Sequence, residues 1–216
     1  MGVPNLAMYK LLNLFPKVKS IKCHGKVNTV DIEKYVNMAC GTVKCLEIRE
    51  ANIDLNRLFK YDPKLVHLAG KKGYHWNTSQ LRSLTLIDSR MLLKPTDVKT
   101  MSYSLVNIKA LDFSGSHPSK FPSKLIAELL TALEDLESFT ALRSPKIAND
   151  VLDALGSNCL KLNTLSLGGL ANDYNEELSL EGVESLLKGK RLKHVKFEYC
   201  TKIGDQAIKA LALGFH

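Results

Sequence analysis

The sequence lacks the features of a secreted or membrane protein. No apolar run approaches the roughly 18 residues that a membrane-spanning helix needs. Met1–Lys10 has no basic segment followed by an apolar stretch, as a secretory signal would. The five cysteines are an odd number, which excludes a fully paired disulfide framework. We therefore expect an intracellular protein, cytoplasmic or nuclear, without a membrane span.

Signatures of catalysis are missing as well. The sequence has no G-x-S-x-G elbow, no phosphate-binding loop and no H-E-x-x-H pair. Its six histidines are scattered, and no catalytic triad follows from their spacing. We expect a protein that is not an enzyme and that binds no cofactor.

The cysteines raise the question of a zinc site. Cys23 and His24 are followed by Cys40 and Cys45, and this spacing is not that of a standard pair of zinc-ligand knuckles. Cys23 fills an apolar position of the repeat described next, where a small buried hydrophobic residue is a sufficient explanation. We predict that all five cysteines are unpaired and bind no metal.

An internal repeat is what the sequence does contain. The pattern apolar-x-x-apolar-x-apolar recurs, and most copies start 22 to 30 residues apart. The clear copies are Val18/Ile21/Cys23, Val43/Leu46/Ile48, Leu81/Leu84/Leu86, Ile108/Leu111/Phe113, Leu136/Phe139/Ala141, Leu162/Leu165/Leu167 and Leu192/Val195/Phe197. With a weaker copy at Leu65/Leu68/Gly70, about eight repeats start near 18, 43, 65, 81, 108, 136, 162 and 192. The alternation in each copy predicts a short strand with one buried face.

A second apolar set at helical spacing follows four of these copies. The sets are Phe121/Ile126/Leu129, Ile147/Leu152/Leu155, Leu178/Val183/Leu186 and Ile203/Ile208/Leu211. Each unit is therefore expected to be strand, turn and helix, and to bury its apolar face only against neighbouring units. The sequence predicts one α/β solenoid domain over residues 1–216, with parallel strands on the concave face and helices on the convex face. Residues 1–17 would be a capping helix or part of an earlier repeat.

The repeat length and pattern resemble those of leucine-rich-repeat proteins. Residues 200–211, CTKIGDQAIKAL, resemble the cysteine-containing repeat of F-box leucine-rich-repeat proteins, and Cys40 and Cys159 stand where that subfamily places its other cysteine. We therefore predict that Cys40, Cys159 and Cys200 are buried. The resemblance covers about residues 15–213 and implies a right-handed horseshoe that recognises proteins, commonly as the substrate-binding arm of a ubiquitin ligase. No F-box precedes the repeats, so a stand-alone scaffold or adaptor is the alternative.

Positive charge is concentrated in the first half of the chain. The net charge is +8, and residues 1–108 carry 17 Lys/Arg against 8 Asp/Glu, whereas residues 109–216 carry 13 against 14. A basic half suits an acidic protein, a nucleic acid or a lipid surface, and a solvated face without a partner is equally open. We expect a protein partner with acidic character, and nucleic-acid association is the alternative.

The strand alternation identifies the side chains that point away from the core. At the two ends of the array they are mostly charged or polar: Ser20, Lys22, His24, Cys45, Glu47 and Arg49 at one end, and His194, Lys196 and Glu198 at the other. In the middle they are small and rich in hydroxyls: Ser83, Thr85, Ala110, Asp112, Ser114, Ser138, Thr140, Thr164 and Ser166. Such short side chains either admit the backbone of a partner or only relieve crowding on a curved sheet, and the sequence leaves both open.

The least repeat-like segment is Gly70–Trp76. Leu65 and Leu81 are 16 residues apart, too few for a normal helix, so we expect a strand-like segment followed by a loop near the basic end. The candidate protein-binding site combines this loop with that end: Lys22, His24, Glu47, Arg49, His67, Lys71, Lys72, Tyr74, His75 and Trp76. The alternative for Trp76 is that it fills the core gap left by the missing helix.

Three further predictions concern the last third of the chain. Gly168-Gly169 follows a strand and predicts a turn that needs the conformational freedom of glycine. Residues 171–177 are an inserted acidic loop, which we expect to be solvated. Gln206–Leu213 predicts a helix whose outward apolar face stays exposed, so association through this edge of the array is expected.

Overall fold

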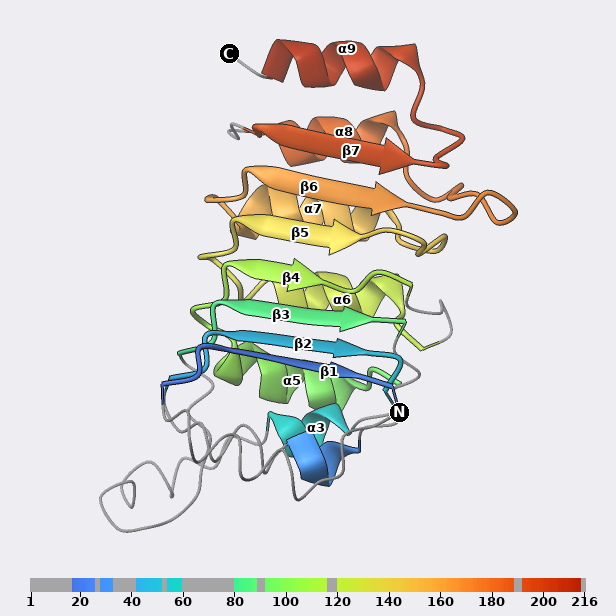
Figure 1. The fold of residues 1–216 in the computed structure, drawn as a ribbon. Helices are drawn as coiled ribbons and strands as arrows, with labels where there is room; N and C mark the ends of the chain where they lie inside the picture. Colours follow the sequence, from blue (N-terminus) through green and yellow to red (C-terminus); the bar gives the residue numbers. More distant parts are fainter. Residues whose placement is uncertain are drawn as a thin grey trace.

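The computed structural model of the chain has an α/β fold built on one all-parallel sheet. The structure describes residues 17–25, 28–32, 42–51, 54–59, 80–88, 92–115, 120–188 and 192–214. Seven strands in these ranges lie side by side in the order of the sequence (Figure 1). They are β1 (Ser20–His24), β2 (Cys45–Arg49), β3 (Ser83–Ile87), β4 (Ala110–Asp112), β5 (Ser138–Ala141), β6 (Thr164–Gly168) and β7 (His194–Glu198).

Helices lie behind one face of this sheet (Figure 1). They are α3 (Leu55–Leu58), α5 (Pro95–Ser104), α6 (Ser123–Leu130), α7 (Asn149–Asn158), α8 (Leu180–Leu187) and α9 (Asp205–Gly214). Local sequence explains where they start. Pro95, whose ring fixes φ, opens α5, and the Asp97 carboxylate accepts a hydrogen bond of 2.8 Å from the Lys94 amide. Asp54 is the N-cap of α3, and its carboxylate accepts a hydrogen bond from the Arg57 amide.

The strands are aligned so that equivalent repeat positions face one another. Leu46 of β2 pairs with Ile21 of β1 and with Leu84 of β3, and the same register continues to β7. The inner residues form one continuous core with the helices, and its centre is a set of phenylalanines. The ring of Phe113 lies 5.3 Å from that of Phe121 and 6.4 Å from that of Phe139. All seven strands predicted from the clear repeat copies are confirmed.

A left-handed backbone residue recurs two positions after the last apolar residue of six copies. These residues are Gly25, Glu50, Asp88, Gly115, Arg143 and Tyr199, with φ between 50° and 83°. Left-handed φ is unfavourable for residues with a side chain, so neighbouring structure must maintain it. Part of that support is visible in the sheet, because the amide of Glu50 donates to the Ile87 carbonyl and the amide of Asp88 donates to the Ser114 carbonyl. The units are therefore equivalent in backbone conformation as well as in apolar pattern.

Two predictions about residues at the ends of strands are wrong. Gly168 and Gly169 were expected to supply left-handed freedom, but neither has a positive φ. They allow close approach instead, since a Cβ on Gly168 would lie 2.3 Å from the Glu198 carbonyl oxygen. Ser114 was expected to point outward, but it is 6% exposed because β4 ends at Asp112 and the chain then turns inward. The Ser114 hydroxyl accepts a hydrogen bond from the Leu142 amide.

Some predictions lie outside the described residues. These are the N-terminal helix or partial repeat, the third repeat from Leu65, and the burial of Cys40. The sheet itself passes directly from β2 to β3, which pair along five residues.

Candidate functional site

The face of the sheet away from the helices carries the outward side chains, and we call it the open sheet face. The strand register arranges them in rows that run across the sheet. The first row is Ser20, Cys45, Ser83, Ala110, Ser138, Thr164 and His194, and the second is Lys22, Glu47, Thr85, Asp112, Thr140, Ser166 and Lys196. Adjacent strands lie about 4.8 Å apart, so each row extends over roughly 29 Å. No helix of the described ranges lies on this side in Figure 1.

Glu47 is the centre of a charged cluster at the β1–β2 end of the open sheet face. Its carboxylate lies 2.8 Å from Lys22 Nζ, 2.6 Å from Arg49 Nε and 3.5 Å from His24 Nε2. The Glu47 side chain is 15% exposed, whereas those of its three partners are 42% to 65% exposed. Hydrogen bonds from Lys22 and Arg49 lower the pKa of Glu47 to about 2, so the carboxylate is ionised near neutral pH. With two permanent cations around one anion, the cluster is positively charged.

The structure therefore brings four of the predicted site residues together: Lys22, His24, Glu47 and Arg49. The other six, His67, Lys71, Lys72, Tyr74, His75 and Trp76, lie outside the described residues, and so does their expected position beside this cluster.

The opposite end of the open sheet face is also charged. Lys196 Nζ lies 2.6 Å from Glu198 Oε1 on the same strand, and His194 is exposed beside them. Between the two ends the side chains are short and half-buried. Asp112 stands out among them as a carboxylate, and one of its oxygens accepts a hydrogen bond from the Ser114 amide. A partner can thus approach the backbone closely in the centre and meet charge at both ends.

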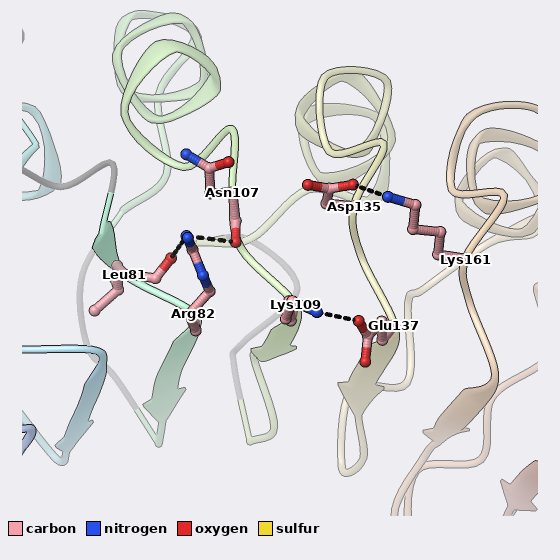
Figure 2. A network of polar contacts seen from close by, with 7 residues as sticks. All are labelled: Leu81, Arg82, Asn107, Lys109, Asp135, Glu137 and Lys161. Carbon is pink, nitrogen blue, oxygen red and sulfur yellow. Dashed lines mark hydrogen bonds and ion pairs between the residues drawn. The ribbon is translucent and has the colours of Figure 1, made fainter.

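A row of basic residues at the amino-terminal edge of the sheet extends the positive end. Lys19, Lys44, Arg82 and Lys109 each directly precede a strand, and Glu137 follows them in the next unit. Figure 2 shows that Lys109 pairs with Glu137, and that Arg82 donates to the backbone carbonyls of Leu81 and Asn107.

The first two lysines of this row differ from Arg82 and Lys109 in their contacts. Lys19 and Lys44 are exposed, and neither forms an ion pair with any residue that the structure describes. This edge row was not predicted from the sequence, although its signal is simple: each of its residues follows the first apolar position of a copy.

A second ion pair crosses the carboxyl-terminal edge of the sheet. Arg143 Nη2 lies 3.1 Å from the Asp88 carboxylate, and Gly115 lies between the two units that carry these residues. A Cβ on Gly115 would come within 1.9 Å of Asp88 Oδ1, so a larger residue here would displace the Asp88 side chain from this position. The repeat pattern does not predict this contact because its partners are 55 residues apart.

The inserted loop at residues 171–177 is exposed, as expected, except at Asn175. Asn175 is fully buried, its Nδ2 donates to the Ile147 carbonyl, and its Oδ1 accepts from the amides of Glu177 and Leu178. Its own amide donates to the Tyr199 carbonyl at 2.7 Å. Asn175 therefore fixes the loop to the units on both sides. The repeat pattern does not predict this role, because the insertion shifts Asn175 out of the repeat spacing.

The last unit leaves an apolar hollow of about 690 Å³ at the end of the sheet. Its lining is Tyr174, Val195, Phe197, Tyr199, Cys200, Thr201, Ile203, Ile208, Leu211 and Ala212. On α9, Ala207 and Leu211 are buried, whereas Ile208 is 57% and Leu213 72% exposed. The predicted exposure of the outward apolar face of this helix is confirmed. Association through it stays a prediction.

The cysteines differ in their surroundings. Cys23 and Cys159 are buried, Cys45 is exposed, Cys200 is half-buried, and all four are free thiols. Burial raises the pKa of the Cys23 and Cys200 thiols to about 11, which keeps both protonated near neutral pH. Cys200 was predicted to be buried, and it is only half-buried because it borders the hollow.

Metal binding at Cys23 and Cys45 meets a geometric obstacle. Cys23 points into the core, and Cys45 points outward from the neighbouring strand, so the sheet separates the two sulfur atoms. Within the described ranges, no three His, Cys, Asp or Glu side chains gather as metal ligands would, and no helix is long and apolar enough to cross a membrane.

Comparison with known proteins adds no family to this description. No protein-family model matches the chain, and no curated protein sequence matches it.

Proposed function

We propose that this chain is a leucine-rich-repeat solenoid that binds a protein partner on its open sheet face. The observation that carries the proposal is the form of that face, about 29 Å of aligned parallel strands. Short hydroxyl side chains occupy its centre, and charge is clustered at each end. An interface needs a contiguous, accessible surface with polar groups that fix orientation, and this face offers both.

Three features support the leucine-rich-repeat assignment. Each clear apolar copy coincides with a strand, the strands stack in sequence order, and a left-handed residue recurs at one position of the unit. The helices lie next to the helices of adjacent units and share one core with the strands, as in an array in which a unit buries its apolar face against its neighbours.

The charge of the β1–β2 end indicates the chemistry of the partner. Lys22 and Arg49 outnumber Glu47, and the exposed Lys19 and Lys44 add positive charge along the adjoining edge. A partner with acidic residues there would gain steering and orientation from these charges. The recognition arm of a ubiquitin ligase is a narrower form of the proposal, and it is supported only by the resemblance of residues 200–211.

The proposal is tested by blocking the centre of the open sheet face. Ser138→Arg places a long side chain in the first row, at a half-buried position that points away from the core. Affinity purification from cell extract should identify proteins retained by the wild type, and calorimetry with the purified partner should show at least about a tenfold loss of affinity for Ser138→Arg. Lys124→Arg, on the exposed surface of α6, should bind as the wild type does.

Two outcomes would reject this function. If Ser138→Arg melts like the wild type and keeps full affinity for every partner, the open sheet face is not the binding surface. If the chain instead binds a DNA or RNA duplex with an affinity that falls steeply with salt, and Lys19→Glu/Lys44→Glu abolishes that binding, nucleic-acid association replaces it.

A further inference from the structure

Among the described residues, β7 is an edge strand, and no strand pairs with its outer side. In a parallel sheet, alternate residues direct their backbone groups to opposite sides. The His194 amide donates to the Asn163 carbonyl and the Glu198 carbonyl accepts from the Gly169 amide, so residues 194, 196 and 198 face β6. The amides and carbonyls of Val195 and Phe197 therefore face the free side of β7.

A backbone hydrogen-bond contact that recurs from unit to unit also ends at β7. Six carbonyls, one before each of the strands β1 to β6, accept hydrogen bonds of 2.7–3.1 Å from two amides of the next unit, that of the residue directly before its strand and that of the strand's first residue. They belong to Lys19, Lys44, Arg82, Lys109, Glu137 and Asn163. The seventh carbonyl in this series is that of Lys193, and it accepts no such pair from any described residue. The Lys193 carbonyl is thus placed to accept the corresponding amides of one further strand.

The core side of β7 is open as well. Leu165 and Leu167 on β6 are fully buried, but Val195 and Phe197, which pair with them, are only half-buried. The hollow of about 690 Å³ lies beside them, with Ile208 of α9 on its border. Free backbone groups and unfilled apolar space therefore occur together at this edge.

We propose that β7 receives an extended segment of a protein partner as a further parallel strand. The first two amides of that segment would donate to the Lys193 carbonyl, as the corresponding two amides do in the six preceding contacts. The segment has apolar side chains at two alternate positions, which pair with Val195 and Phe197 and enter the hollow. This binding surface is separate from the open sheet face and does not depend on the function proposed for it.

A second copy of the chain is a poorer occupant. The strand it could offer in parallel is β1, whose apolar residues Ile21 and Cys23 are 6% and 4% exposed and so already covered. They could not also fill the hollow beside β7. The end of the sheet at β7 therefore requires a strand whose apolar side chains are free.

The test uses a synthetic peptide with the sequence of residues 161–170, which holds the β6 strand and three leucines of one repeat copy. Amide exchange of the full chain is followed by NMR with and without the peptide. Strand addition should slow exchange of the Val195 and Phe197 amides by at least about tenfold and leave the His194 and Lys196 amides unchanged. A peptide in which both leucines at 165 and 167 are serine should have no such effect.

Two variants of the protein show whether the hollow takes part. Ile208→Glu places a carboxylate on the border of the hollow at an exposed site, so the fold is retained and peptide affinity should fall at least about tenfold. Gln206→Glu adds the same charge at an exposed position of α9 outside the lining, and it should bind the peptide as the wild type does.

Three results would overturn the proposal. The first is no binding of the peptide at about 1 mM. The second is binding without the alternating protection of residues 195 and 197, which would mean simple apolar docking. The third is protection of these two amides in the free protein together with a mass that rises with concentration, which would assign the edge to a second copy of the chain.

Discussion

At the scale of the residue, Glu47 organises the charged end of the open sheet face. Lys22 comes from β1 and Arg49 from β2, and the Glu47 carboxylate lies within hydrogen-bonding distance of both. Lys22 and Arg49 are diagonal neighbours on adjacent strands, so without Glu47 between them their like charges would repel. Glu47 therefore both fixes the positions of these side chains and limits their repulsion.

Glu47→Gln should lower the free energy of unfolding at pH 7 by about 1 kcal/mol, a modest value because its partners are well exposed to solvent. The pKa of Glu47 is lowered to about 2 from its ordinary 4.5. The stabilisation is therefore complete above pH 4.5 and is lost as the pH falls through about 2. Urea unfolding of both proteins at pH 7 and at pH 3 should show a smaller difference at the lower pH.

The exposed Glu134 provides the control, since Glu134→Gln removes a carboxylate that has no ion pair among the described residues. A difference between wild type and Glu47→Gln that stays constant from pH 7 to pH 3 would contradict the role given to this carboxylate.

Asn175 illustrates a buried polar group whose bonds are all made within the fold. Asn175→Ala would leave the Ile147 carbonyl and the Leu178 amide without a partner in a buried place. The expected loss is about 3 kcal/mol in the free energy of unfolding, measured in urea. Asn172→Ala, at an exposed position of the same loop, should stay within about 0.5 kcal/mol of the wild type. Equal effects of the two substitutions would mean that the loop is not anchored through Asn175.

At the scale of the element, strands were easier to predict than the contacts between them. An alternating pair such as Leu165 and Leu167 has one buried face whatever lies beside it, so local pattern was sufficient. The helix sets were right where another unit follows, but Ile208 is exposed because no described unit packs on its side of α9. Contacts such as Asp88 with Arg143 depend on residues far apart in the chain, and a pattern with a period of one unit carries no information about them.

The open sheet face was likewise predictable only as far as local strand alternation determines it. The outward position of Lys22, Glu47 and Arg49 follows from alternation, and the register then places them together. The free backbone groups of β7 were not predictable, because they depend on which strand lacks a neighbour.

Gly168 tests how closely two strands must approach. Gly168→Ala would place a methyl group 2.3 Å from the Glu198 carbonyl oxygen, which is backbone and cannot rotate away. We expect a loss of about 2 kcal/mol in the free energy of unfolding, typical of an overpacked site. Gly204→Ala is the matched control, since a Cβ there meets nothing within 4 Å, and it should be neutral within about 0.5 kcal/mol. Thermal unfolding that fails to separate the two variants would contradict this account.

At the scale of the whole molecule, the units form a linear array. Strand order follows the sequence, and each of the helices α5 to α9 contacts the helices next to it in the sequence. The stability of such an array is close to a sum of unit and interface contributions, so a local defect is transmitted through the units next to it. The β7 end, like the β1 end, has interfaces on one side only among the described residues, so it should open more readily than the centre of this part of the chain.

A linear array predicts which units are destabilised by a substitution in the core. Leu155 in α7 is fully buried and Leu211 in α9 is 8% exposed, so replacing either with alanine should cost about 3 kcal/mol locally. Hydrogen exchange measured by mass spectrometry should show faster exchange for Leu211→Ala in β7 and α9, with β3 to β5 unchanged. Leu155→Ala lies between units on both sides and should accelerate exchange from β5 to β7. If Leu211→Ala instead accelerated exchange equally in every strand, the chain would unfold as one cooperative unit, and the linear array would be the wrong description of its energetics.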